Sequence, residues 1–130
     1  MNKKILIIIL VVVAIIGAAL YIFVFKGEPP IKYTFYSPGE YFVTNVNNSN
    51  RLFKISVVLV LDTEELQDQL TEQNSRIRDR IISILRGMDE ITLKSLDTED
   101  LLKKQIKDAI NQALETEHIV EILFNDYVIQ

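Results

Sequence analysis

The sequence predicts an α+β domain that is held to a membrane by a single N-terminal helix. Three features predict this: an uncharged apolar run near the N-terminus, stretches rich in β-forming residues, and stretches whose apolar residues recur with a helical period. The chain has 130 residues. Beyond the apolar run this is enough for one small domain with a modest hydrophobic core.

The apolar run covers residues 5–25 and carries no charge. A helix rises about 1.5 Å per residue, so this run spans roughly 30 Å, the thickness of a bilayer's hydrocarbon core. Lys3 and Lys4 precede the run and only Lys26 follows it, which favours a cytoplasmic N-terminus and an exported remainder. We predict a cytoplasmic tail at residues 1–4 and a single-pass transmembrane anchor, in contact with membrane lipid, at residues 5–25.

A cleaved signal peptide is the alternative interpretation of this run. Gly17 and Ala19 would form a small-x-small cleavage site after an apolar stretch of ordinary signal length. However, the chain stays apolar for six residues beyond Ala19, as an anchor does. The uncleaved anchor is therefore the favoured prediction.

The composition of the exported part excludes some functions. From Lys26 onward the chain has 12 basic and 18 acidic residues, a net charge of −6. An acidic chain on the outside of a membrane is not a general nucleic-acid binder, because such proteins present a basic surface. The chain has no cysteine, so its fold depends on packing without disulfide bonds.

Residues 26–40 are predicted to form a linker. They contain all three prolines of the chain and two of its four glycines, which is typical of an extended segment with turns. The linker also carries Tyr33, Phe35 and Tyr36. A simple spacer does not need aromatic side chains, so we expect part of the linker to pack on the domain or on a partner.

A β-hairpin and a final strand are predicted in the domain, residues 41–130. Residues 41–46 and 51–62 are β-rich and flank the turn-forming stretch NNSN. The second of these runs places on one face Phe53, Ile55, Val57, Leu59 and Leu61. The stretch HIVEILFNDYVIQ, residues 118–130, predicts a strand that is paired in the sheet.

Two helices are predicted between the hairpin and the final strand. Over residues 63–87 the apolar residues stay in phase on one helical face, even across the polar residues at Gln73 and beyond, so one long helix is the simpler prediction. The second helix covers residues 98–117 and has Thr98 as its N-cap. The predicted order of elements is β-β-α-α-β.

The first predicted helix contains the charged stretch RIRDR. Arg76, Arg78, Asp79 and Arg80 project away from the centre of the isoleucine stripe. Glu72 and Arg76 form an i, i+4 pair and Arg76 and Asp79 an i, i+3 pair. We interpret Arg76 and Arg80 as part of a solvated helix face, because no glycine-rich cradle or metal site accompanies them.

No catalytic constellation is apparent. His118 is the single histidine of the chain and is expected in a solvated turn, since one histidine cannot make a zinc site without further ligands. Asn111 lies beside the apolar stripe of the second helix, where a buried hydrogen bond is expected. The acidic residues that follow the hairpin suit the start of a helix without any bound calcium. We predict a protein that is not an enzyme and that has no metal site and no cofactor.

Taken in this order after an anchor, the segments resemble the FliL family of flagellar basal-body proteins. The segments that carry the resemblance are PGEYFVTNV at 38–46, RLFKISVVLVL at 51–61, RIRDRIISIL at 76–85, LLKKQIKDAIN at 101–111 and VEILFNDYVIQ at 120–130. The last is the most specific. Val46 and Asn125 depart from the family pattern, where leucine and threonine are common.

The resemblance implies a fold, partners and a function. The exported domain is expected to resemble the stomatin/SPFH-like α+β domain, and copies of it are expected to form a homo-oligomeric ring around the flagellar stator. That stator is the ion-driven MotA/MotB torque generator, whose activity the family promotes in the inner membrane. Arg78 and Asp79 match the family and are expected in a subunit contact or in a hydrogen bond within the domain. A membrane-tethered module that binds a ligand or lipid is the alternative function.

Overall fold

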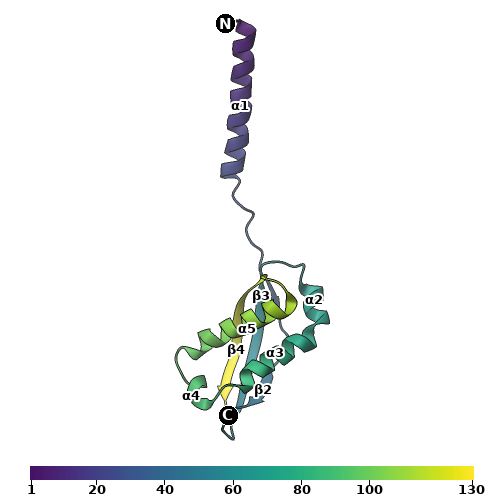
Figure 1. The fold of residues 1–130 in the computed structure, drawn as a ribbon, viewed down its shortest axis with the longest axis vertical. Helices are drawn as coiled ribbons and strands as arrows, with labels where there is room; N and C mark the ends of the chain where they lie inside the picture. Colours follow the sequence, from purple (N-terminus) through teal and green to yellow (C-terminus); the bar gives the residue numbers. More distant parts are fainter. The chain divides into compact units, whose positions relative to one another are not determined.

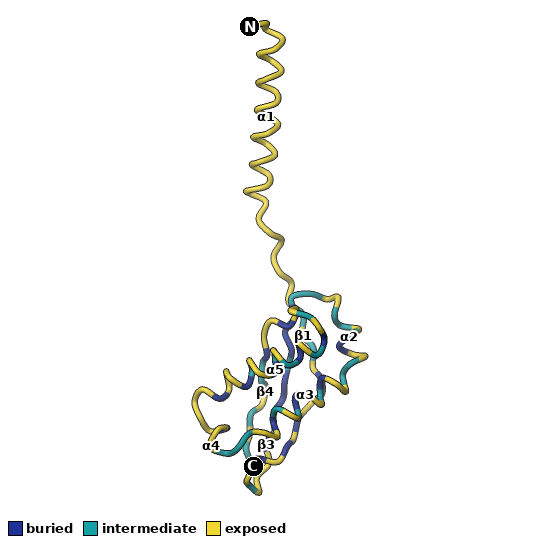
Figure 2. Tube along the Cα trace, in the orientation of Figure 1, coloured by how far each residue is buried: buried dark blue, intermediate teal, exposed yellow.

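The computed structural model describes residues 1–130, which divide into two units, residues 1–30 and 31–130. The first unit contains helix α1 (Lys3–Phe25) and the residues that follow it (Figure 1). By length and composition α1 could cross a membrane. Every residue of α1 is exposed (yellow in Figure 2), and its exposed residues beyond Lys4 are apolar or small on every side, which is typical of a helix whose solvent is lipid.

The second unit is an α+β domain with one antiparallel sheet. Its strands are β1 (Thr34–Tyr36), β2 (Phe42–Asn45), β3 (Leu52–Leu61) and β4 (Ile119–Ile129). β3 is the central strand. β4 pairs along one of its edges, whereas β1 and β2 pair with opposite ends of β3 along the other. The predicted α+β class and the predicted hairpin, formed by β2 and β3, are confirmed.

The sequence pattern of β3 explains its central place. The five alternating residues predicted to share one face, Phe53, Ile55, Val57, Leu59 and Leu61, are each fully buried. β4 runs antiparallel beside them, from Leu61 opposite Ile119 to Phe53 opposite Ile129. Two irregularities in this register leave Val120 and Asn125 without a partner on β3. Such bulges bend an edge strand and discourage further strands from pairing with it.

Helices cover the inner face of the sheet. They are α2 (Gln67–Glu72), α3 (Asn74–Arg86), α4 (Glu90–Leu93) and α5 (Thr98–Leu114). α5 packs on β4, α3 packs on β2, and α3 and α5 contact each other (Figure 1). Isoleucine and leucine side chains from both helices meet the buried side of β3 in a single core. The domain therefore has two layers, and the outer face of its sheet is uncovered.

The helix predicted over residues 63–87 is wrong in two respects. It begins only at Gln67, because Thr63 instead accepts a hydrogen bond from Glu65 N in a local turn. It is also interrupted at Gln73, which leaves the helical conformation with φ −99° and ψ 17°. Beside the break, Tyr36 Oη lies 3.1 Å from Leu70 O and 2.9 Å from Asn74 Oδ1. A side chain from a distant strand thus occupies the interruption, so helical periodicity alone could not predict it.

The linker predicted at residues 26–40 is shorter in the structure. β1 lies within it, and Pro38 is buried. The compact domain begins at Ile31, ahead of the predicted boundary at residue 41. Because prolines and glycines flank β1 on both sides, the sequence pattern did not indicate this strand of three residues. The observed order therefore has three strands before the helices, not two.

The region between α3 and the last strand also differs from the prediction. Residues 90–93 form the short helix α4, whose N-cap Asp89 accepts a hydrogen bond of 2.7 Å from Thr92 N. Thr98 is the first residue of α5 and not its cap, since its hydroxyl donates to Thr92 O. The helix ends at Leu114, three residues early, because Glu115 adopts a left-handed conformation with φ 54°.

Candidate interaction surfaces

Arg78 makes contacts inside the domain. It projects from α3 and is half-buried, and its Nη1 donates a 3.0 Å hydrogen bond to Pro38 O. Its guanidinium carbon lies 4.5 Å from the centre of the Phe42 ring, within the range of a cation–π contact. A Cβ atom at Gly39 would collide with the guanidinium, so glycine leaves room for it. Arg78 thus fastens the segment before β2 to α3.

The other charged residues of RIRDR face solvent. Asp79, Arg76 and Arg80 are exposed. The predicted ion pairs of Arg76 with Glu72 and with Asp79 are absent from the salt bridges of the structure; Arg76 instead bonds weakly to Gln73 Oε1 at 3.5 Å. The structure therefore separates Arg78 from its neighbours, and Asp79 remains a candidate contact residue on the surface.

The aromatic residues of the predicted linker divide between the two faces of the sheet. Tyr36 points inward, and its partial burial raises the pKa of its hydroxyl. Phe35 points outward with 61% of its surface exposed, and Tyr33 is 53% exposed. Tyr36 therefore has a place in the fold, whereas Tyr33 and Phe35 are available to a partner.

Tyr33 and Phe35 line an apolar groove on the outer face of the sheet. The groove has a volume of about 490 Å³, and its other lining residues are Val60, Val120, Glu121 and Leu123. Apolar side chains dominate this lining, as in many ligand or partner sites. The groove brings together residues from β1, β3 and β4, which only the sheet topology makes neighbours.

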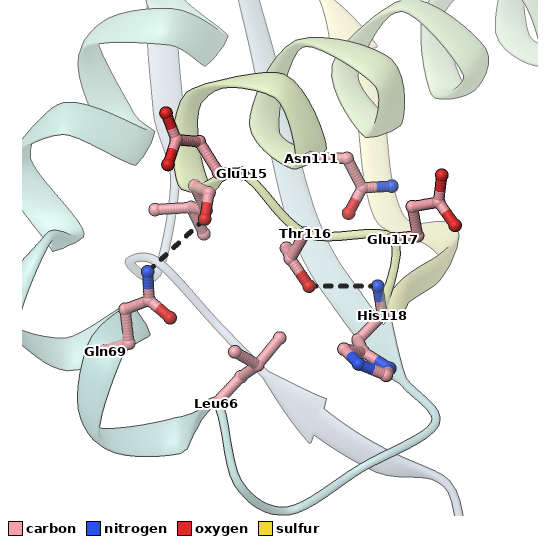
Figure 3. Close-up of a pocket in the computed structure, with 8 residues that line it drawn as sticks. Leu66, Gln69, Asn111, Glu115, Thr116, Glu117 and His118 are labelled. Carbon is pink, nitrogen blue, oxygen red and sulfur yellow. Dashed lines mark hydrogen bonds between the residues drawn. The ribbon is translucent and has the colours of Figure 1, made fainter.

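A more polar hollow of about 660 Å³ lies where α2 and the end of α5 approach β4 (Figure 3). Several of its polar side chains are hydrogen-bonded within the domain. Asn111 Nδ2 donates to Ile119 O at 2.9 Å and its Oδ1 accepts from Ile119 N at 3.2 Å, so the predicted hydrogen bond of Asn111 is confirmed. Gln69 Nε2 donates to Leu114 O at 3.4 Å. These contacts hold the corner together.

His118 lies at the same corner and is more than half exposed at its side chain. Its Nδ1 lies 2.8 Å from Asp62 Oδ1, across the end of β3 and the start of β4. The chain has no group of three or more His, Cys, Asp or Glu residues placed to hold a metal ion. The two polar side chains therefore join the end of β3 to the start of β4.

Sequence reasoning missed three exposed apolar side chains in α4 and in the residues that follow it. Ile91 is 85% exposed and Leu96 is 99% exposed, and Leu101 in the first turn of α5 is exposed as well. The stretch ITLKSL, residues 91–96, could have indicated this, because a short helix can turn only some of its apolar residues toward the core. Only the structure shows that Leu93 is the residue that enters the core.

A helix of membrane-spanning length followed by a small α+β domain is the layout of the class of single-pass membrane proteins. Residues 35–130 match the model of the family described as flagellar basal body-associated protein FliL. The chain belongs to the FliL family, as the resemblance predicts. These proteins are flagellar accessory proteins and are not known as enzymes.

A relative of known name agrees with this assignment. The chain is similar to the flagellar protein FliL of Bacillus subtilis (strain 168), with 23% identity over 91 residues. The match covers 70% of this chain and 64% of the relative, so the chain spans less than two thirds of that relative's length. The family match begins at Phe35, inside β1, which agrees with a domain that starts before residue 41.

Proposed function

We propose that this protein is a non-enzymatic scaffold of the flagellar motor. A single anchor holds it in the inner membrane, with the N-terminus in the cytoplasm and the α+β domain outside. Copies of the domain, which resembles the SPFH-like domains, form a ring around the MotA/MotB stator and support torque generation and motility. The observation that carries the proposal is the family match over residues 35–130 behind a helix of membrane-spanning length.

The surface of the domain supports a scaffold role. Contacts with partners need exposed side chains that the fold itself does not use, and the domain has several. Asp79, Tyr33 and Phe35 are exposed, and Ile91 and Leu96 are almost fully exposed. Clustered apolar side chains on the surface mark sites of interaction. We propose Asp79 and the two outward aromatics as contact residues, with Arg78 and Tyr36 shaping the surface from beneath.

The first test is recovery of the full-length tagged protein from its native membrane without detergent. Recovery of a large oligomer together with the stator pair supports the scaffold. A monomer recovered without the stator, from cells that build motors, contradicts it. The matched test variant is Phe35→Ser, which removes one apolar side chain from the outer face and leaves the core intact; the wild type is its reference. We expect it to reduce recovery of the stator more than that of the protein itself.

Topology has a test of its own because the chain contains no cysteine. Asn2→Cys and Gln105→Cys each place one thiol, on the predicted cytoplasmic tail and on the exposed face of α5. A membrane-impermeant maleimide applied to intact cells is expected to label residue 105 and not residue 2. Labelling of residue 2 alone would invert the proposed orientation.

The apolar groove favours one second candidate, a membrane-tethered module that binds an apolar ligand or lipid. Its volume and its lining by Tyr33, Phe35, Val60 and Leu123 suit a small apolar molecule. This candidate predicts that the purified full-length protein carries a lipid or small molecule, which Leu123→Asp removes. The scaffold predicts no such cargo.

A further inference from the structure

A stripe of charged side chains begins at Glu65, in the turn before α2, and continues along the solvent face of α2 and α3. Its acidic half, at the start, consists of Glu65, Asp68 and Glu72; its basic half, farther along, consists of Arg76, Arg80 and Arg86, with Asp79 between the arginines. All seven side chains belong to exposed residues. None takes part in a salt bridge within the chain. This charged stripe is therefore free to meet another molecule.

The charged stripe differs from an ordinary solvated helix face. Such faces usually alternate acidic and basic residues so that they neutralise each other locally. Here residues of one sign are grouped at each end. The basic half also consists of arginine alone, and α3 holds four of the five arginines of the chain. Arginine is enriched and lysine depleted at protein interfaces, because the planar guanidinium binds carboxylates through two parallel hydrogen bonds.

The rest of the domain indicates which molecule the arginines meet. From Lys26 onward the chain has a net charge of −6, so anionic lipid and nucleic acid would be repelled by the domain as a whole. An acidic protein surface of limited size is the better match. The acidic half of the charged stripe on another copy has this chemistry and a similar length.

We propose that the basic half of the charged stripe in one copy contacts the acidic half in a second copy. The proposal rests on the self-association in the proposed function and names the surface that performs it. Two stripes laid parallel and in register would place like charges together. A stripe shifted by half its length, or turned antiparallel, places Arg76 and Arg80 beside Asp68 and Glu72 of its neighbour. A shifted contact is heterologous, so its repetition from copy to copy builds a ring where the rotation between copies closes, whereas an antiparallel contact joins two copies only.

Electrostatics of this kind select an orientation more than they supply affinity. Individual exposed ion pairs contribute little and are screened by salt. Anchors in one membrane, however, hold the copies at a high effective concentration, so a weak contact is sufficient. The charged stripe is thus expected to set the register between copies, and the association is expected to weaken as the ionic strength rises.

Cysteine cross-linking in the native membrane tests the contact directly, with no background from native thiols. Two differently tagged full-length copies carry Asp68→Cys and Arg80→Cys, respectively. The control pairs Asp68→Cys with Gln105→Cys, another exposed site, which lies on α5. We expect about tenfold more disulfide-linked heterodimer from the first pair than from the control. Equal yields from the two pairs overturn the proposal.

Charge reversal supplies a second and independent measurement. Asp68→Arg with Glu72→Arg leaves Glu65 and Asp79 as the only acidic residues of the stripe, and Arg76→Glu with Arg80→Glu leaves Arg86 as its only basic residue. Each double variant is expected to lose about tenfold in co-precipitation of two tagged copies, and the fourfold variant to recover it, because opposite halves are restored. All side chains concerned are exposed, so the thermal unfolding midpoint of each variant serves as the folding control.

The outcomes separate this proposal from the proposed function. Copies that co-precipitate equally in the wild type and in both double variants overturn the role of the charged stripe and leave the scaffold intact. Wild-type copies that do not associate at all overturn both. Loss in each double variant with recovery in the fourfold variant supports the proposed contact.

Discussion

Helices α3 and α5 lie on the same face of one sheet and use the same kind of core contact, yet their outer surfaces differ. α3 buries Ile77, Ile81 and Leu85, and α5 buries Leu102, Ile106 and Ile110. On their outer sides, α3 presents arginines without ion pairs, whereas α5 presents lysines, one of which pairs with Glu99 at 3.1 Å. The comparison teaches that the inner face specifies the fold, while the outer face distinguishes two otherwise similar helices.

The two helices are also attached to the sheet in a similar way. A polar side chain of each reaches the backbone just before or at the start of a strand: Arg78 bonds to Pro38 O ahead of β2, and Asn111 bonds to both backbone groups of Ile119 in β4. Arg78 offers a charge and one hydrogen bond at a half-exposed site. Asn111 offers two hydrogen bonds at a part-buried site. The two attachments should therefore differ in strength.

The largest effects are expected where the helices are alike. Ile81→Ala in α3 and Ile106→Ala in α5 each remove a fully buried side chain from the core. Each is expected to lower the free energy of unfolding by about 2–5 kcal/mol, from lost apolar burial and the cavity that remains. Urea unfolding of the full-length protein in mild detergent measures both. A loss from one helix several times that from the other would show that the two do not share one core.

A smaller loss is expected from Asn111→Ala. It leaves the N–H and C=O of Ile119 without their partner, at a cost of about 1–3 kcal/mol. The same unfolding measurement applies. Gln105→Ala, on the exposed face of the same helix, is the control and should lie within about 0.5 kcal/mol of the wild type. A neutral Asn111→Ala would show that water replaces both hydrogen bonds.

Removal of the other attachment is expected to cost less. Arg78→Ala removes one charge-assisted hydrogen bond and the contact with the Phe42 ring, at about 1–2 kcal/mol, since the site is only half-buried. Arg80→Ala, two residues along on the solvent side, is the matched control and should not alter the monomer's stability. Equal effects of the two substitutions would contradict the separate role assigned to Arg78.

The smallest effect concerns the short helix α4 that connects the two. Hydrogen bonds from Thr92 hold the pKa of the Asp89 carboxyl below its usual 3.8, and the hydrogen bond from Lys94 lowers the pKa of Glu90 below 4.5. Both groups have lower pKa values folded than unfolded. Their stabilisation is thus complete above the unfolded values and is lost as pH falls through the folded ones.

This pH dependence can be measured as the thermal unfolding midpoint between pH 7 and pH 3. The wild type is expected to lose stability below about pH 4.5 more steeply than the Asp89→Asn, Glu90→Gln double variant, which has no carboxylates to protonate there. Parallel curves for the two proteins would mean that α4 is not held by these carboxylates.

The core of the fold could be predicted from sequence because it follows from periodicity. Alternation identified the buried face of β3, and the helical period identified Ile77, Ile81 and Leu85. Periodicity could not predict contacts between segments that lie far apart in the sequence. β1 is too short to show a period, and the interruption at Gln73 coincides with Tyr36, which lies on β1.

The same limit applies to the candidate surfaces. Asn111 could be predicted to hydrogen-bond because a polar side chain stood beside an apolar stripe. The partner of Arg78 could not be predicted, because Pro38 lies forty positions away in the sequence. RIRDR is one pattern in the sequence, but the fold divides it into one residue that serves the domain and neighbours that face solvent. A local charge pattern does not show which of its residues the fold uses and which face solvent.

The central position of β3 has a consequence for how the chain is made. Synthesis proceeds from the N-terminus, so β3 emerges while the whole segment 62–118 and then β4 are still to come. Until Ile119–Ile129 arrives, one edge of the most deeply buried strand has no partner, and unpaired apolar edges promote aggregation. The sheet therefore cannot be completed until β4 has been synthesised. A chain interrupted before β4 would leave that edge of β3 unpaired and open to aggregation, so synthesis through Ile129 is needed before the sheet can form.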